Sequence, residues 1–192
     1  NRAHPDANIE VDLITGYEIK GGYAAATAGM GAPAAIVGVD FSKYAANAFS
    51  LLQEVAARHG KDLRYNIPVE LGGFSIFFPL LLSLITEFKT VDADGAGRAV
   101  PALETLLLHV NGCPTTPIAL AKGVNDKITV ELADYHNAPL AEKIGRDICG
   151  EFGNMVGISG WLVDKTDIEN RIITGSITLC EKIGAIMRRA NC

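Results

Sequence analysis

Short apolar runs of β type alternate with helical segments along this chain, and three of the runs end in glycine. Such alternation is typical of a layered α/β domain, in which helices flank a sheet. With 192 residues, of which 48% are hydrophobic, the chain is long enough for one domain with a substantial core. We therefore expect residues 1–192 to form a single α/β domain, or to be a fragment of a longer two-domain protein.

Apolar spacing and turn residues define the expected elements. Strands are predicted at residues 22–28, 64–69, 89–92, 117–122, 127–132 and 155–163, and helices at 43–59, 79–88, 101–110, 139–152 and 176–189, with a short helix opening at 166. The fourth and fifth strands are separated by a short turn and indicate a hairpin. A hairpin makes the sheet mixed, so we expect a mixed, mostly parallel sheet flanked by helices.

The most apolar stretch is Phe74 to Ile85 (FSIFFPLLLSLI), about a dozen residues between Glu70 and Glu87. A membrane span needs roughly 20 apolar residues, so this stretch predicts a buried helix instead. Pro79 lies inside it. Either the helix kinks at Pro79, or it begins there and the preceding residues are extended.

Charge and cysteine content narrow the classes of function. The formal net charge of −5, with scattered basic residues, argues against nucleic acid or a membrane surface as partner. Four cysteines lie far apart without a CxxC pair, which disfavours a disulfide framework or a zinc site and favours the cytoplasm. Cys113 is interpreted as a loop-packing thiol, because no base lies near it in the sequence.

The segment Thr90 to Arg98 (TVDADGAGR) has the composition of a binding site. If the strand continues, Asp92 and Asp94 share one face, and the helix expected at 101–110 would add free N–H donors beside them. The site could hold a divalent ion or a polar ring, with one carboxylate as general base. The alternative is a structural loop, in which Asp92 caps the backbone or pairs with Arg98. The segment lacks the third acidic residue that metal-binding loops of this pattern carry. A divalent metal ion therefore stays possible but is not favoured.

Glu70 precedes Gly72 and Gly73 at the end of an apolar strand, where a carboxylate is either a site residue or a backbone cap. Ligands of α/β sheets bind beyond the carboxyl ends of the strands. Three glycine-bearing strand ends are thus expected to form one crevice: residues 29–33, 70–73 and 92–98. Neither GxxxxGK[ST] nor GxGxxG occurs, which disfavours nucleotide binding. Among four histidines without metal-ligand spacing, His136 is the best placed to reach a crevice.

The segments at residues 31–33, 68–73, 91–101 and 174–177 occur in the order found in a known family. On these residues the chain resembles the S-methyl-thiohydantoinase-like family, whose members are often encoded beside, or fused to, hydantoinase/oxoprolinase enzymes. The similarity runs from about Met30 to Arg189, and we expect it to cover only the family's N-terminal α/β domain. It implies hydrolytic opening of a five-membered cyclic amide or thioamide-derived ring.

The resemblance assigns candidate roles residue by residue. The catalytic candidates are Asp92, Asp94, Arg98 and Glu70. The substrate-binding candidates are Gly72, Gly73, Gly95, Gly97 and Gly31. Either aspartate would act as base or orient water, and the guanidinium would neutralise charge on the carbonyl oxygen. The alternative is a non-catalytic ligand-binding or assembly module that needs a partner chain or missing segments, and we expect a homo-oligomer or a partner chain in either case.

Overall fold

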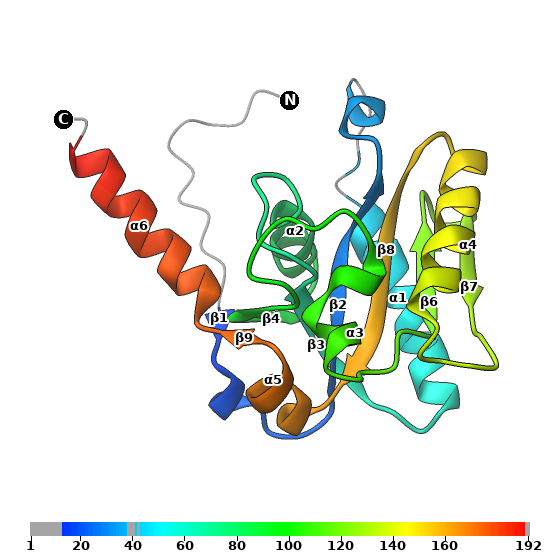
Figure 1. The fold of residues 1–192 in the computed structure, drawn as a ribbon, viewed down its shortest axis with the longest axis horizontal. Coiled ribbons are helices and arrows are strands. Elements are labelled where there is room, and N and C mark those ends of the chain that lie inside the picture. The colour runs from blue at the N-terminus through cyan, green and yellow to red at the C-terminus, as the bar shows by residue number, and fades with distance from the viewer. Residues whose placement is uncertain (1–12, 38–40, 42, 191–192) are drawn as a thin grey trace.

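A computed structural model describes residues 13–37, 41 and 43–190, and a seven-stranded sheet forms its centre (Figure 1). The strand order is β1-β4-β3-β2-β8-β6-β7. These strands are β1 (Leu13–Ile14), β2 (Tyr23–Gly31), β3 (Leu63–Pro68), β4 (Lys89–Val91), β6 (Ile118–Ala121), β7 (Lys127–Val130) and β8 (Met155–Val163). Two further strands, β5 (Ala93–Asp94) and β9 (Ile173–Thr174), pair with each other in a separate small sheet.

The sheet is mixed, as the sequence predicted. Strands β1, β4, β3 and β2 pair in parallel, whereas β2–β8, β8–β6 and β6–β7 are antiparallel. Because two antiparallel steps restore direction, β6 runs the same way as β2, and only β7 and β8 run against the others. The expected hairpin is confirmed as β6–β7.

Helices cover both faces of the sheet. On one face lie α1 (Tyr44–Arg58) and α2 (Phe77–Ile85), and on the other lie α3 (Leu107–Val110), α4 (Ala138–Glu151) and α5 (Lys165–Arg171). Short 3₁₀ turns occur at η1 (Gly16–Glu18), η2 (Pro33–Ile36) and η3 (Leu103–Thr105). The last helix, α6 (Ser176–Ala190), extends away from the sheet (Figure 1).

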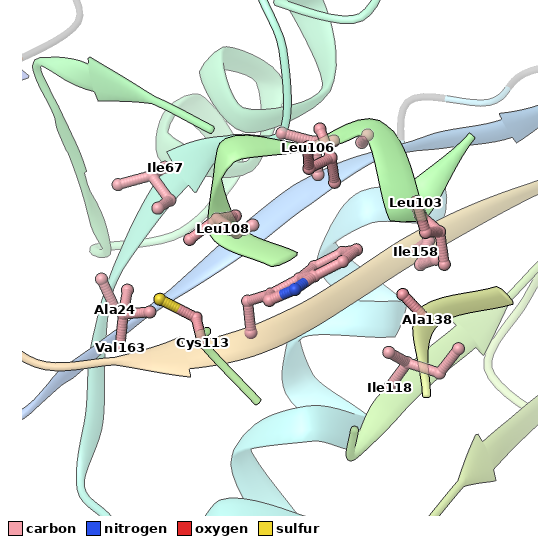
Figure 2. Close-up of a cluster of buried hydrophobic side chains, with 14 of the residues drawn as sticks. Ala24, Ile67, Leu103, Leu106, Leu108, Cys113, Ile118, Ala138, Ile158 and Val163 are labelled. Atoms are coloured by element: carbon pink, nitrogen blue, oxygen red, sulfur yellow. The ribbon is translucent and has the colours of Figure 1, made fainter. Parts of the chain in front are cut away.

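Small residues in β2 allow both helical layers to approach the sheet closely. Ala24 and Ala26 belong to the core cluster on the α4 face, and Ala25 between them belongs to the cluster on the α1 face. This alternation follows from the two-residue period of a strand. Figure 2 shows Leu103, Leu106 and Leu108 packed over the sheet on the first of these faces. Burial of each such leucine side chain contributes about 1.5–3 kcal/mol to folding.

The expected helix over residues 101–110 is wrong. Residues 103–105 form a 3₁₀ turn, Leu106 is extended at φ −75° and ψ 144°, and only Leu107–Val110 are α-helical. Leu103, Leu106 and Leu108 are all buried. Their spacing of three and then two residues does not fit one helical face, so burying all three requires the break at Leu106.

The apolar stretch before β4 is only partly the buried helix that was expected. The helix begins at Phe77, which places Pro79 in its first turn, where the missing N–H costs nothing. Phe78, Pro79 and Leu82 are buried, but Phe77, Leu84 and Ile85 are exposed. Among the described residues, no helix has both the length and the apolar character needed to cross a bilayer.

The contact between α1 and β8 depends on a glycine. A Cβ atom added at Gly157 would lie 2.2 Å from the carbonyl oxygen of Tyr44 and 2.3 Å from its carbonyl carbon. We therefore expect Gly157→Ala to push α1 off the sheet and to lower the free energy of unfolding by about 3 kcal/mol, measured by urea denaturation.

The matched control is Gly150→Ala in α4, where the added methyl group meets no atom within 4 Å. Alanine has the higher helix propensity, so this control variant is expected to keep or slightly raise stability. Equal stability of the two variants would contradict the close contact between α1 and β8.

Candidate functional site

A pocket of about 290 Å³ lies at the carboxyl ends of β2 and β3. Its walls come from the end of β2, the loop after β3, the segment from Ala99 to Leu106, and α4. Its polar side chains are Glu70, Ser75, Glu142 and Arg146. Its apolar wall includes Met30, Phe74, Leu103, Met155 and Ile158. The position agrees with the general rule that α/β sheets bind ligands at this edge.

Two hydrogen bonds fix the Glu70 side chain at this pocket. Ser75 Oγ donates to its Oε1 at 2.5 Å, and the Val100 N–H donates to its Oε2 at 2.5 Å. Gly72 and Gly73 follow it and also line the pocket. Neither of these two glycine N–H groups donates to another of the described residues. A fixed carboxylate therefore lies beside two backbone donors that no described residue uses.

Sequence reasoning missed the second polar pair of the pocket, Glu142 and Arg146 of α4. Arg146 Nε donates to Glu142 Oε1 at 2.6 Å, and Arg146 Nη2 donates to the Pro101 carbonyl oxygen at 3.1 Å. Glu142 Oε2 accepts from the Leu103 N–H at 3.2 Å. The only local signal was the i,i+4 spacing of opposite charges, which is also typical of a solvated helix surface.

Asp92 has a structural partner rather than a place in this pocket. Its Oδ1 accepts from the N–H groups of Ile177 at 2.9 Å and Thr178 at 3.2 Å, and its Oδ2 accepts from Thr178 Oγ1 at 2.5 Å. The helix N-terminus beside the acids thus exists, but it belongs to α6 and not to residues 101–110. A carboxylate at a helix N-terminus satisfies free N–H groups and complements the helix dipole.

Asp94 folds its own loop. Its Oδ1 accepts from the Ala96 N–H at 2.9 Å and from the Gly97 N–H, while its buried Oδ2 has no hydrogen-bond partner in the described structure. Gly97 adopts φ +73°, which favours glycine. Arg98 is exposed, and no hydrogen bond or ion pair joins it to another described residue.

Gly95 brings the loop against the sheet. Its N–H donates to Pro68 O at 3.2 Å, and its carbonyl accepts from the Leu107 N–H at 2.9 Å. A Cβ atom there would lie 2.7 Å from Val69 O. This close approach accounts for glycine at the position without a ligand.

The expected common crevice therefore forms only in part. Gly31, Glu70, Gly72 and Gly73 line the pocket at the ends of β2 and β3. Asp92 lines a different pocket of about 210 Å³, with Thr15, Glu169 and Gly175 among its neighbours. Asp94, Gly95, Gly97 and Arg98 line neither. The two aspartates do not share a strand face, because β4 ends at Val91 and their carboxylates bind different segments.

The comparison with protein families decides the affiliation. Residues 4–132 match the family model described as the S-Me-THD-like N-terminal domain. The chain belongs to the S-Me-THD-like family. The expectation that only the N-terminal domain would be represented is wrong, because residues 136–192 match the S-Me-THD-like C-terminal domain. Both matched regions contribute to one sheet, since β8 lies between β2 and β6.

A solved relative supports the fold of this S-Me-THD-like chain. The crystal structure of a protein from Chromobacterium violaceum superposes with a TM-score of 0.85 at 25% sequence identity. The alignment covers 95% of this chain and 50% of that protein, so the chain spans about half the length of this relative. No curated protein matches the chain significantly.

Two other candidate groups of this S-Me-THD-like chain, Cys113 and His136, lie outside the pocket at Glu70. Cys113 is buried, and burial raises the pKa of its thiol, which fits the loop-packing interpretation. His136 is exposed and does not line the pocket at Glu70, and His4 lies outside the described residues. In the part of the chain that the structure describes, no three His, Cys, Asp or Glu residues are placed to hold a metal ion together.

The cap at Asp92 gives a structural prediction. In Asp92→Ala the N–H groups of Ile177 and Thr178 lose their acceptor, so the start of α6 should fray at a cost of roughly 0.5–2 kcal/mol. Amide hydrogen exchange of these two residues should accelerate. Asp92→Asn keeps one carbonyl oxygen and should show a smaller effect. Unchanged exchange in the alanine variant would contradict the capping role.

Proposed function

We propose that this chain is a hydrolase-like domain that binds a small cyclic amide of hydantoin type in the pocket at Glu70 and opens its ring. The observation that carries the proposal is the position of Glu70. Its carboxylate lines a pocket next to two glycine N–H groups that no described residue uses. The choice of a hydantoin-type ring rests on the family resemblance alone, because members of the family are often encoded beside hydantoinases or fused to them.

Glu70 would act as the general base. Its two hydrogen bonds, from Ser75 and Val100, fix the orientation of the carboxylate. Each carboxylate oxygen has a second acceptor site, so Glu70 can still accept a hydrogen bond from a water molecule or a ring N–H. A carboxylate with a fixed orientation and a free acceptor site meets the geometric need of general base catalysis.

Hydrolysis of the ring amide needs a water molecule, Glu70 as base and the two glycine N–H groups. A water molecule adds to the ring carbonyl carbon and gives its proton to Glu70, while the carbonyl oxygen becomes an oxyanion. The N–H groups of Gly72 and Gly73 would bind this oxyanion. The ring C–N bond then breaks, and Glu70 returns the proton to the leaving nitrogen. Arg98, exposed next to the pocket residue Ala99, is a further candidate to neutralise the developing charge.

The pocket's charge favours a neutral ring. Two acidic residues, Glu70 and Glu142, and one basic residue, Arg146, line the pocket, so its formal charge is −1. An anionic ligand would be repelled, whereas a ring N–H can donate to a carboxylate. The apolar wall of Met30, Phe74 and Met155 suits an apolar ring substituent.

Glu70→Gln tests this proposal. The amide keeps the shape of the side chain but cannot take a proton, so hydrolysis of hydantoin to N-carbamoylglycine, followed by chromatography, should fall by about 10²–10⁴-fold. Glu87→Gln, at an exposed position outside the pocket, is the matched control. Wild-type turnover by Glu70→Gln would remove the base role, and absence of both turnover and saturable hydantoin binding in the wild type would contradict the proposal.

One observation favours a second candidate function, an assembly module. Leu179, Ile183, Ile186 and Met187 of α6 are 57%, 48%, 65% and 60% exposed. Their spacing of four, three and one residues places them on one side of the helix. Contiguous exposed apolar surface of this kind marks protein interfaces. A second copy of the chain would cover it in a homo-oligomer.

Replacing Ile183 and Ile186 together by Gln tests self-association through α6. The double variant should lower the molar mass measured by size-exclusion chromatography with light scattering to that of one chain, because the apolar contact is lost. Lys182→Gln, exposed on the same helix, should leave the mass unchanged. A monomeric wild-type chain would contradict self-association through this helix.

A further inference from the structure

The wall of the pocket from Val100 to Leu103 is attached at both ends to charged side chains. Glu70 accepts from the Val100 N–H at 2.5 Å, and Glu142 accepts from the Leu103 N–H at 3.2 Å. Between them, Arg146 donates to the Pro101 carbonyl oxygen at 3.1 Å. Three charged side chains therefore bind the backbone of three of these four residues.

Residues 100–102 of this wall belong to no helix or strand. Ala102 is extended, at φ −156° and ψ 157°, and the 3₁₀ turn begins only at Leu103. Pro101 has no N–H group, so this part of the wall has fewer backbone hydrogen bonds with which to fix itself. Leu103 anchors the far end in the core. Contacts from outside the segment must therefore set the conformation of residues 100–102.

Glu142 and Arg146 are suited to that task because they also bind each other. Arg146 Nε donates to Glu142 Oε1 at 2.6 Å, across one turn of α4. The Glu142 side chain is only 13% exposed. Glu142 binds the N–H of Leu103, and Arg146 binds the C=O of Pro101. A donor and an acceptor fixed on one rigid helix restrict a neighbouring loop more than either bond alone.

We propose that Glu142 and Arg146 are positioning residues, which hold the wall from Val100 to Leu103 so that the Val100 N–H stays bound to Glu70. They act on the site through Val100 and not by touching the reacting atoms. The two residues belong to the region that matches the C-terminal domain, whereas Glu70 and Val100 belong to the N-terminal one. The pocket is thus completed across the two family regions. The effect on ligands rests on the proposed function, but the positioning itself does not.

Amide hydrogen exchange by NMR on the complete chain tests the positioning directly. In Arg146→Ala and Glu142→Ala, the amides of Val100 and Leu103 should exchange about 5–30 times faster, because each variant loses contacts worth about 1–2 kcal/mol. Alanine maintains helix α4. Lys143→Ala, exposed on the same helix, is the control, and Arg146→Lys should restore part of the protection. Unchanged exchange at Val100 in Arg146→Ala would overturn the proposal.

A second measurement distinguishes positioning from general support of the fold. If hydantoin is turned over, both alanine variants should lower kcat several-fold more than they raise KM, because a less firmly held Glu70 is a poorer base, and Arg146→Lys should recover part of the loss. Faster exchange at Val100 with unchanged kinetics would show that the wall does not shape the site and would overturn its functional role. If the wild-type chain neither binds nor opens hydantoin, the proposed function fails, while the exchange experiment still decides the positioning.

Discussion

The antiparallel pairing of β2 with β8 is the interaction on which the remaining structure depends. The two strands pair from Ala24–Val163 to Gly31–Met155, and Thr27 and Ser159 add a buried hydroxyl hydrogen bond of 3.2 Å. β8 is buried along its whole length and also pairs with β6. Without β8, β6 and β7 would have no bond to the parallel strands. The two family regions are therefore parts of one sheet.

This pairing also sets the place of the pocket. β2 and β3 are parallel, so their carboxyl ends lie together, and the glycine-rich loop after β3 leaves space beside Gly31. α4 packs near the end of β2, where Gly145 faces Met30 and Cys149 Sγ donates to the Met30 carbonyl oxygen at 3.2 Å. Glu142 and Arg146 of this helix reach the wall opposite Glu70. The chemistry of the site thus comes from segments far apart in the sequence.

Local patterns predicted the elements well and the long-range contacts poorly. The predicted bounds of β8, residues 155–163, agree with the structure, because a continuous apolar run between turn residues is a local signal. The sequence around Asp92 could not show its role, since Asp92 caps a distant helix. The N–H group of Ile177, from which its carboxylate accepts a hydrogen bond, lies 85 residues later in the chain. Loop composition could suggest either a cap or a site, and only the fold separates the two alternatives.

The candidate site was predicted in part for the same reason. Glu70 and its glycines were identified from a carboxylate placed at the end of an apolar strand, where burial without a partner is costly. Arg146 and Glu142 were missed, because an i,i+4 pair of opposite charges on a helix is common on solvated surfaces. The break at Leu106 was missed because Pro101 and Gly112 bound the segment as the start and stop of a helix do. Only the burial of Leu103, Leu106 and Leu108 together excludes a single helical face.

The central claim is that the ligand site lies at Glu70 and not at Asp92. An NMR titration of the chain with hydantoin tests it most directly, by following backbone amide shifts. Hydantoin bound at Glu70 should give saturable shifts at Gly72, Gly73 and Val100 and leave the amides of Gly175 and Ile177 unaffected. Shifts centred on Gly175 and Ile177, with none around Glu70, would contradict it.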